Sequence, residues 1–473
     1  MYMYGHTEIN MKSGTITGNV YGGGAGGVIG INPWDMHVPY ATNDADNATN
    51  AIMNGVQYGE WGPKKAGSPL ANVTLHDSDG NGGYTTNQLN LSESYTTLNI
   101  SGGTINGSVY GGGCGYVSNM PEQVVMQGVG SVFGTSNVNI SGGTIHGSVY
   151  GGSEGSDKYY GAVNKYDQTI NHIAEMNGTV NLTVTGIESQ YATIGGSVYG
   201  AGMGIVSKSA TEEYLRIATA GNYDLAGPGA TEEQKSKYKT DINITIDMPE
   251  TVEFPNDIYG GGALGKVDGN TNIVLKRGKF TGNIYGGGYG ELNHRDKARV
   301  TGTTNIYTGA VDVVGYQSMP VTVAPSETDD TKVPTIYGGG NMAQVTGNTY
   351  INIWHGNITA DVFGGGRGLN EAQSAGYSGY GWVNGNTRVL YNNTTTDNKL
   401  IGNIYGGGAL GAVVGTGDDN YKYKGTTVVI KAGEVDGDVF GGGKGEVGSD
   451  KAKVTGNTNV IVDKDWTEPT STP

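Results

Sequence analysis

Apolar and polar residues alternate along this chain in short blocks, and the blocks repeat. Six segments of equal length align without a gap, and their third, fifth, tenth and fourteenth positions are apolar. The eighth position is Gly in all six, and the apolar parity changes there from odd to even. Alternation with period two predicts strands with one buried face, and the parity change predicts a turn or bulge at the Gly. The six segments are residues 7–24, 96–113, 136–153, 271–288, 349–366 and 426–443.

Each block ends in the same phrase, which is Val or Ile, then an aromatic ring, then a glycine cluster. The shortest spacing between successive rings is 26 residues, and the extra length of longer spacings falls mostly after the glycines. A repeat of this length with variable insertions at one corner predicts a stacked solenoid. We therefore predict an all-β, right-handed parallel β-helix of about ten or more coils, with loop and short-helix insertions. The rings are Tyr21, Tyr110, Tyr150, Tyr199, Tyr259, Tyr285, Tyr337, Phe363, Tyr405 and Phe440.

The repeats indicate one elongated domain over residues 1–466, followed by a linker-like tail at 467–473. Three insertions are expected, at 25–95, 205–239 and 367–384. The second carries helix signals, a capping-box pair at Ser209 and Glu212 and a second start at Glu232. Because a full repeat begins at Thr7 without a leader before it and the chain stops in the middle of another repeat, we expect a segment of a longer protein.

Composition narrows the function classes. The chain has 86 Gly and 31 Tyr among 473 residues, and its formal net charge is −16. Without a Lys- or Arg-rich run it lacks the positive surface that nucleic acid requires, so no nucleic-acid partner is predicted. No apolar stretch approaches 18 residues, so we predict no membrane insertion by this segment. Cys114 is the only cysteine and is expected to be a small packed residue.

The Val or Ile before each ring is the expected core residue, so in an extended strand the ring itself should face outward. A column of rings at the coil spacing suits either structural stacking or contact with sugars, and replacement of Tyr by Phe at two positions favours stacking. The better candidates for glycan contact are aromatic residues of the insertions, because displayed loops carry specificity. These candidates are Tyr377, Tyr380, Trp382, Trp34 and Trp61.

Few residues suggest a cofactor. Asp77, Asp79 and Asn81 match the first, third and fifth positions of a calcium loop, but Gln88 stands where a bidentate Glu is needed. An Asx-rich turn is the favoured interpretation, and a weak calcium site is the alternative. The GxxxxGK pattern ending at Lys266 lacks the Ser or Thr that would hold magnesium, so no nucleotide site is predicted. We expect no other cofactor.

The repeats resemble a known class of surface protein. The stretch 141–152, Ser-Gly-Gly-Thr-Ile-His-Gly-Ser-Val-Tyr-Gly-Gly, is similar to Gly-rich β-helix repeats of bacterial cell-surface adhesins and autotransporter passengers. It is also weakly similar to repeats of polymorphic outer-membrane proteins, although Thr stands where their motif has Ala. The resemblance implies an extracellular or bacterial cell-surface rod that contacts host or environmental glycans or surface proteins, and it carries over no catalytic residue.

Two alternatives to an adhesive rod remain. A β-helix polysaccharide lyase or glycoside hydrolase would need carboxylates on neighbouring coils, and the column that precedes each Val or Ile has no two acids in succession. Acids supplied by loops keep this alternative open. A self-assembling filament would use the open strand edges at the two ends of the solenoid for self-association.

Overall fold

The computed structural model describes most of the solenoid. The described residues are 2–3, 6–29, 52–53, 56–57, 73–78, 84–89, 95–118, 121, 125, 128–163, 169–205, 218–223, 229–236, 238–292, 297–309, 321–370, 379–394, 399–415 and 424–467.

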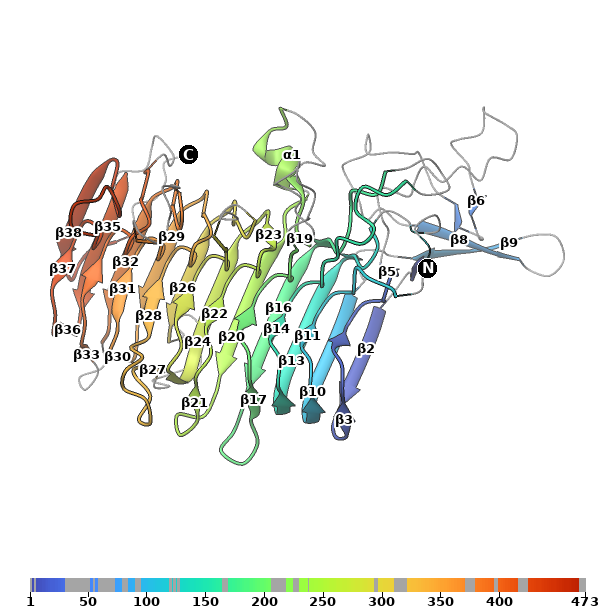
Figure 1. Cartoon of the computed structure of the whole chain (residues 1–473), viewed down its shortest axis with the longest axis horizontal. Helices are drawn as coiled ribbons and strands as arrows, with labels where there is room; N and C mark the ends of the chain where they lie inside the picture. Colours follow the sequence, from blue (N-terminus) through green and yellow to red (C-terminus); the bar gives the residue numbers. More distant parts are fainter. Residues whose placement is uncertain are drawn as a thin grey trace.

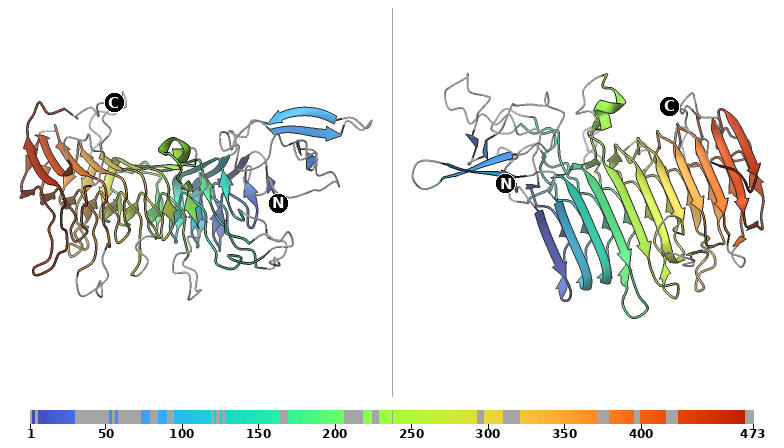
Figure 2. Two further views of the ribbon diagram at one scale, coloured as in Figure 1. Left: turned by 90° about the horizontal axis from the view of Figure 1, so that it is seen from above. Right: turned by 180° about the vertical axis from the view of Figure 1, so that it is seen from behind.

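The chain winds as a parallel β-helix, as the repeats predict. Strands in neighbouring coils pair in parallel with near-constant register, and they form three long sheets. Figure 1 shows the coils side by side in sequence order, from β2 at one end to β38 at the other. Figure 2 shows from two further directions that the stack is elongated and that α1 and several loops project from its edges.

The first sheet, here called the long sheet, contains 18 strands, because each coil supplies one long strand or two shorter ones on either side of a bend. They are β2 (His6–Met11), β3 (Thr15–Ile16), β10 (Tyr95–Ile105), β13 (Thr135–Ile145), β16 (Thr179–Thr185), β17 (Ala192–Ile194), β20 (Asp241–Asp247), β21 (Glu253–Phe254), β24 (Thr271–Phe280), β26 (Thr304–Thr308), β27 (Val321–Val323), β29 (Thr349–Ile353), β30 (Asn357–Ile358), β32 (Thr387–Asn392), β33 (Lys399–Leu400), β35 (Gly425–Ala432), β36 (Glu434–Val435) and β38 (Asn457–Val462).

The second sheet, the aromatic sheet, holds the ten Val/Ile-aromatic pairs, so the described chain makes ten successive passes through it. Its strands are β4 (Val20–Tyr21), β11 (Val109–Tyr110), β14 (Val149–Tyr150), β18 (Val198–Tyr199), β22 (Ile258–Tyr259), β25 (Ile284–Tyr285), β28 (Thr335–Tyr337), β31 (Asp361–Phe363), β34 (Ile404–Tyr405) and β37 (Val439–Phe440).

The third sheet lies between the glycine cluster of one coil and the start of the next long strand. It begins with β1 (Tyr2–Met3), β5 (Val28–Ile29), β12 (Val132–Phe133), β15 (Met176–Asn177), β19 (Thr219–Ala220) and β23 (Lys266–Val267). It continues as single parallel bridges through a row of valines, namely Val267, Val300, Val345, Val383, Val413 and Val454. Thus β5, β19 and Val383 belong to the solenoid although they lie inside the ranges 25–95, 205–239 and 367–384.

The insertions also contain structure of their own. An antiparallel sheet is formed by β6 (Ile52–Met53), β7 (Val56–Gln57), β8 (Val73–Ser78) and β9 (Tyr84–Leu89). The helix α1 (Glu232–Ser236) begins where the second helix start was predicted. A capping box holds it, because Thr231 Oγ1 accepts from Gln234 N while Thr231 N donates to the Gln234 amide oxygen. The Ser209–Glu212 pair lies outside the described residues.

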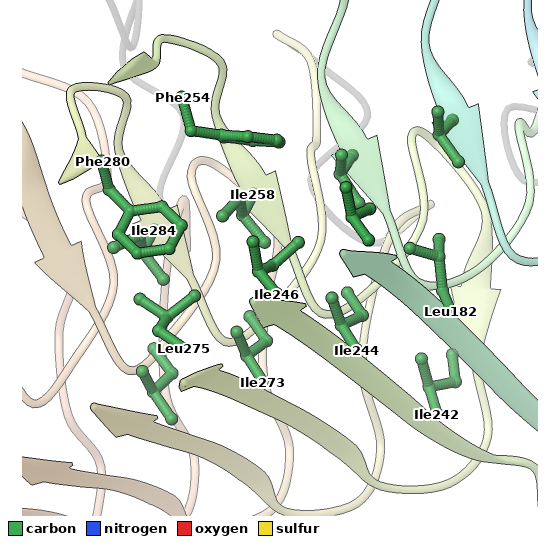
Figure 3. Packing of buried hydrophobic residues seen from close by; sticks show 14 of the residues in the cluster. Leu182, Ile242, Ile244, Ile246, Phe254, Ile258, Ile273, Leu275, Phe280 and Ile284 are labelled. Atoms are coloured by element: carbon green, nitrogen blue, oxygen red, sulfur yellow. The ribbon is translucent and has the colours of Figure 1, made fainter. Parts of the chain in front are cut away.

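One continuous core fills the solenoid. Aliphatic side chains from the three sheets point inward and stack on their equivalents one coil away, as Ile244, Ile273 and their neighbours do in Figure 3. Ile273, Leu275, Ile284 and Ile353 are fully buried, which confirms the predicted strand parity. Burial of this kind of apolar side chain stabilises the fold by about 1.5–3 kcal/mol per residue.

The bend predicted at the repeat glycine is present. The backbone has a positive φ at the eighth position of all six aligned segments, for example 89° at Gly14 and 98° at Gly433. Register shifts follow Ile100, just before Gly103, where β10 and β13 pair. Because a side chain is strained in this conformation, glycine here lets one chain segment supply both halves of the long sheet.

The glycine cluster lets successive coils approach closely. A Cβ atom placed on Gly338 would lie 2.3 Å from the Gly364 carbonyl oxygen of the next coil. The same carbonyl accepts a hydrogen bond from the hydroxyl of Thr349, a buried residue at the start of its coil. The repeated opening Thr and the repeated Gly therefore form one contact that recurs from coil to coil.

The close approach of successive coils can be tested at two equivalent glycines, Gly365 and Gly442, each the second residue after its ring. In Gly365→Ala the new Cβ would lie 2.7 Å from the Gly408 amide nitrogen of the next coil. In Gly442→Ala, at the same position of the repeat after the last ring, no atom lies within 4 Å of the new Cβ. We expect Gly365→Ala to reduce the free energy of unfolding by about 1–3 kcal/mol and Gly442→Ala to change it by less than about 0.5 kcal/mol. Urea denaturation followed by circular dichroism measures both, and equal losses would contradict close packing as the reason for the glycines.

Candidate functional site

The aromatic rings form a ladder along the outside of the aromatic sheet. Each ring stacks on the next through ten coils, with centroids 4.6–5.2 Å apart and planes within 4–11° of parallel. This spacing equals the distance between paired strands, so the backbone register itself brings the rings into contact. The neighbouring Val or Ile belongs to the inner core and the ring to a separate apolar cluster, so the outward direction of the rings is confirmed.

The ladder faces outward but is mostly buried. Eight of its ten rings are at most 9% exposed, and only Tyr21 and Phe440 at its ends are more open. The cover comes from the fourth residue after each ring, here called the cover column, where the chain turns back over the rings. The ladder therefore offers no open row of ring faces for sugars, and structural stacking is its main role. The cover column is Ala25, Cys114, Glu154, Met203, Ala263, Tyr289, Asn341, Arg367, Ala409 and Lys444.

One polar group of the cover column lies over the first coils. The Glu154 carboxylate accepts a short hydrogen bond from the Tyr21 hydroxyl, and its other oxygen lies 3.5 Å from the Tyr110 hydroxyl. The Cys114 thiol donates to the Tyr116 carbonyl and lies 3.6 Å from Glu154. Burial raises the pKa of the Cys114 thiol, which keeps it protonated and agrees with a packed rather than a nucleophilic cysteine.

A second polar group lies over the middle of the ladder, where an arginine, an asparagine, a tyrosine and an aspartate are joined by hydrogen bonds. Arg367 Nη1 donates to the Asn341 amide oxygen at 2.9 Å, and Asn341 Nδ2 donates to the Tyr259 hydroxyl at 3.4 Å. The Tyr259 hydroxyl donates in turn to the Asp257 carboxylate at 3.1 Å. The edge of Tyr289 packs against the Tyr259 ring at 5.8 Å. This network runs from the exposed guanidinium of Arg367 to a half-buried carboxylate, and it is the candidate site.

Electrostatics at the candidate site follow from burial. Removal from water raises the pKa of the Tyr259 phenol, and the negative charge of Asp257 raises it further. Burial also raises the pKa of the Tyr285, Tyr289 and Tyr337 phenols, and the positive charge of Arg367 opposes that rise in all three. These phenols are therefore neutral hydroxyl groups at physiological pH, gathered around one fixed cation.

The residues proposed from sequence for glycan contact do not form a cluster in the described part of the chain. Tyr380 is 3% exposed and so is packed rather than displayed. Trp382 is partly exposed, and its carbonyl pairs with Val345 in the third sheet. Tyr377, Trp34 and Trp61 lie outside the described residues.

Only the strands on either side of the calcium-loop candidate lie within the described residues. Asp77 lies in β8, opposite Thr85 of β9 in an antiparallel hairpin, and the loop that joins these strands contains Asp79 and Asn81. Both lie outside the described residues, as does the Asp77 side chain. Among the residues that the structure does describe, no group of three or more His, Cys, Asp or Glu side chains is placed to hold a metal ion.

Other sequence features have structural roles. Lys266, the last residue of the GxxxxGK pattern, is buried in β23 with its Nζ 2.6 Å from the Asp268 carboxylate. The side-chain oxygens of Asn270, Asn348 and Asn386 each accept a hydrogen bond from a backbone amide of the next coil, so these residues form an Asn ladder beside the opening Thr residues. Sequence reasoning missed the cover column, although its fixed distance of four residues after every ring was a usable signal.

The chain matches no protein-family model, and no significantly similar curated protein or solved structure was found. Within the described residues, no helix has the length and apolar character needed to cross a membrane.

Two substitutions of Tyr285, which is 1% exposed, test what the ladder contributes. Tyr285→Ala should reduce the free energy of unfolding by about 3–5 kcal/mol, because it leaves a ring-sized gap between two stacked neighbours. Tyr285→Phe keeps the ring and should cost less than about 1.5 kcal/mol. Chemical denaturation of both variants measures the difference, and similar losses would show that the hydroxyl rather than the ring is what matters.

The raised phenol pKa values predict a dependence on alkaline pH. Above about pH 10 the ladder tyrosines lose protons in the unfolded chain and keep them in the folded chain, so stability falls as pH rises. Tyr110, Tyr199, Tyr259 and Tyr285 should therefore ionise only when the solenoid unfolds. Tyrosinate absorbance recorded together with circular dichroism tests this. Reversible ionisation of all tyrosines near pH 10 with native circular dichroism would contradict the burial of the ladder.

Proposed function

We propose that this chain is a structural and adhesive rod of a bacterial cell-surface or secreted protein, and that it contacts glycans or surface proteins outside the cell. The observation that supports it best is the unbroken stacking of ten coils by three kinds of ladder. These are the core aliphatics, the aromatic rings and the Thr–Gly contacts. Such stacking makes an extended body whose surface and loops are held at fixed positions along one axis.

The surface of the rod also suits contact with hydroxyl-rich ligands. Asparagines on the outer face of the long sheet donate to one another at 2.8–3.1 Å along successive coils, as Asn181, Asn243 and Asn272 do. Amide groups of this kind keep further donors and acceptors for hydrogen bonds with sugars or water. The resemblance to bacterial surface repeats points in the same direction.

The proposal is tested by adhesion under flow. Beads coated with the chain should be retained on surfaces of mucin, acidic polysaccharide or neutral glucan more strongly than beads coated with albumin. The Trp382→Ala variant is run beside the parent, because Trp382 is partly exposed whereas Tyr380, the other described candidate of the insertion 367–384, is buried. Lower retention of this variant at an unchanged melting temperature would place the contact at that insertion.

Retention no higher than that of albumin beads on every surface would contradict the adhesive role. Release of new reducing ends from any polysaccharide on the panel would instead favour the lyase or hydrolase alternative. Concentration-dependent end-to-end multimers in sedimentation would favour the filament alternative. Val460 and Val462, which are 46% and 77% exposed in β38, offer apolar surface for such contacts.

A further inference from the structure

Arg367 is an exposed cation whose side chain is held by a buried amide group. It stands in the cover column of a chain whose net charge is −16, and among the described residues its side chain bonds to Asn341, which is 5% exposed. A buried amide thus orients an exposed guanidinium. An oriented guanidinium presents a planar fork that fits a carboxylate in a bidentate manner.

A second cation stands in the same column. Backbone hydrogen bonds from Ala409 to Gly366 and from Lys444 to Gly408 place Arg367, Ala409 and Lys444 in three successive coils. Two strand spacings, about 10 Å, separate the backbones of Arg367 and Lys444 along the rod. The Lys444 side chain is 55% exposed and reaches back past the coil of Tyr405, so its Nζ lies 3.4 Å from the Asp361 carboxylate in the coil of Arg367.

We propose that the cover column from Tyr289 to Lys444 binds a carboxylate-bearing polysaccharide lying along the rod axis. In this arrangement Arg367 holds one uronate carboxylate and Lys444 another. The half-buried Tyr289 contributes its hydroxyl and ring edge to the sugar beside Arg367. This inference rests on the proposed adhesive function and names the ligand class for one part of the rod.

The neighbouring acids favour an acidic sugar over other polyanions. Asp257 lies within the network of the candidate site, and the Asp361 carboxylate is 3.4 Å from Lys444 Nζ. These carboxylates repel a densely charged polymer such as a sulfated glycan or polyglutamate. They accept hydrogen bonds from sugar hydroxyls, which a polyuronate presents beside each of its sparser charges.

The test measures binding of the whole chain to polygalacturonate, with dextran, dextran sulfate and poly-L-glutamate as comparison ligands. The parent should bind polygalacturonate most tightly and dextran weakly, with affinity that falls as salt is added. Arg367→Gln should weaken binding to polygalacturonate at least about tenfold. Arg367→Lys should recover only part of it because the fork is lost. Lys444→Gln should weaken binding by a smaller factor.

The matched control is Lys399→Gln, which changes the net charge equally but lies in β33 on the long sheet, where Lys399 pairs with Asp436. It should bind like the parent, and all four variants should melt with the parent because the changed side chains are exposed. Equal loss in Arg367→Gln and Lys399→Gln would overturn the proposal in favour of general charge attraction. Tighter binding of dextran sulfate or poly-L-glutamate would overturn the choice of ligand. If the parent does not bind polygalacturonate but coated beads still adhere to other surfaces, this inference alone is overturned. If the beads adhere to no surface, the proposed adhesive function is overturned as well.

Discussion

The close approach of one coil to the next is the constraint on which the rest of this structure depends. The first residue after a ring is glycine because a Cβ atom there would collide with a carbonyl oxygen of the next coil. At Gly338 the distance from such a Cβ to the Gly364 oxygen would be 2.3 Å. The Thr or Ser that opens the coil completes this contact, since its hydroxyl donates to the same carbonyl. With the backbones held at the spacing of a parallel sheet, every outward or inward position becomes a column along the rod.

The ladders are consequences of this register. Alternate aliphatic residues of each strand point into the solenoid, where each stacks on its equivalent in the next coil. Asparagines on the opposite face of the long sheet hydrogen-bond from coil to coil. The rings of the aromatic sheet meet at 4.6–5.2 Å because that is nearly the distance between their strands. Each added coil therefore repeats the same stabilising contacts, and stability is spread along the rod rather than concentrated in one centre.

The cover column changes the chemistry of the rod's exterior. A bare aromatic ladder would be an exposed apolar stripe on the surface, but the chain turns back and places the cover column over the rings. Positions such as Ala263 and Ala409 only cover the rings, whereas Glu154, Asn341 and Arg367 bring polar groups into contact with the phenol hydroxyls or with each other. Variation at this one position lets a uniform scaffold carry local chemistry.

Much of the fold could be predicted from sequence because it is local and periodic. The alternation of apolar residues, the glycine at the eighth position and the Val/Ile-aromatic phrase determined the strands, their buried faces and the bend, and the structure confirms each at Ile273, Gly278 and Tyr285. The third sheet was missed, although the sequence carries a signal for it. It often consists of one valine per coil, and Val345 and Val383 each lie four residues before the Thr that opens the next long strand. A single residue per coil shows no alternation, so the period-two pattern that marks the other strands does not reveal it.

At the candidate site, too, part of the arrangement could be predicted from the sequence and part depends on the tertiary structure. Arg367, Asn341, Tyr259 and Asp257 are spread over 111 positions of sequence and come from three coils, so only the stacking of those coils brings them into one network. The sequence by itself determined that rings would recur and point away from the core, because a strand's side chains alternate. Only the tertiary structure decided that these rings would be covered and which polar side chains would meet above them, because that depends on how the chain turns back after the glycines.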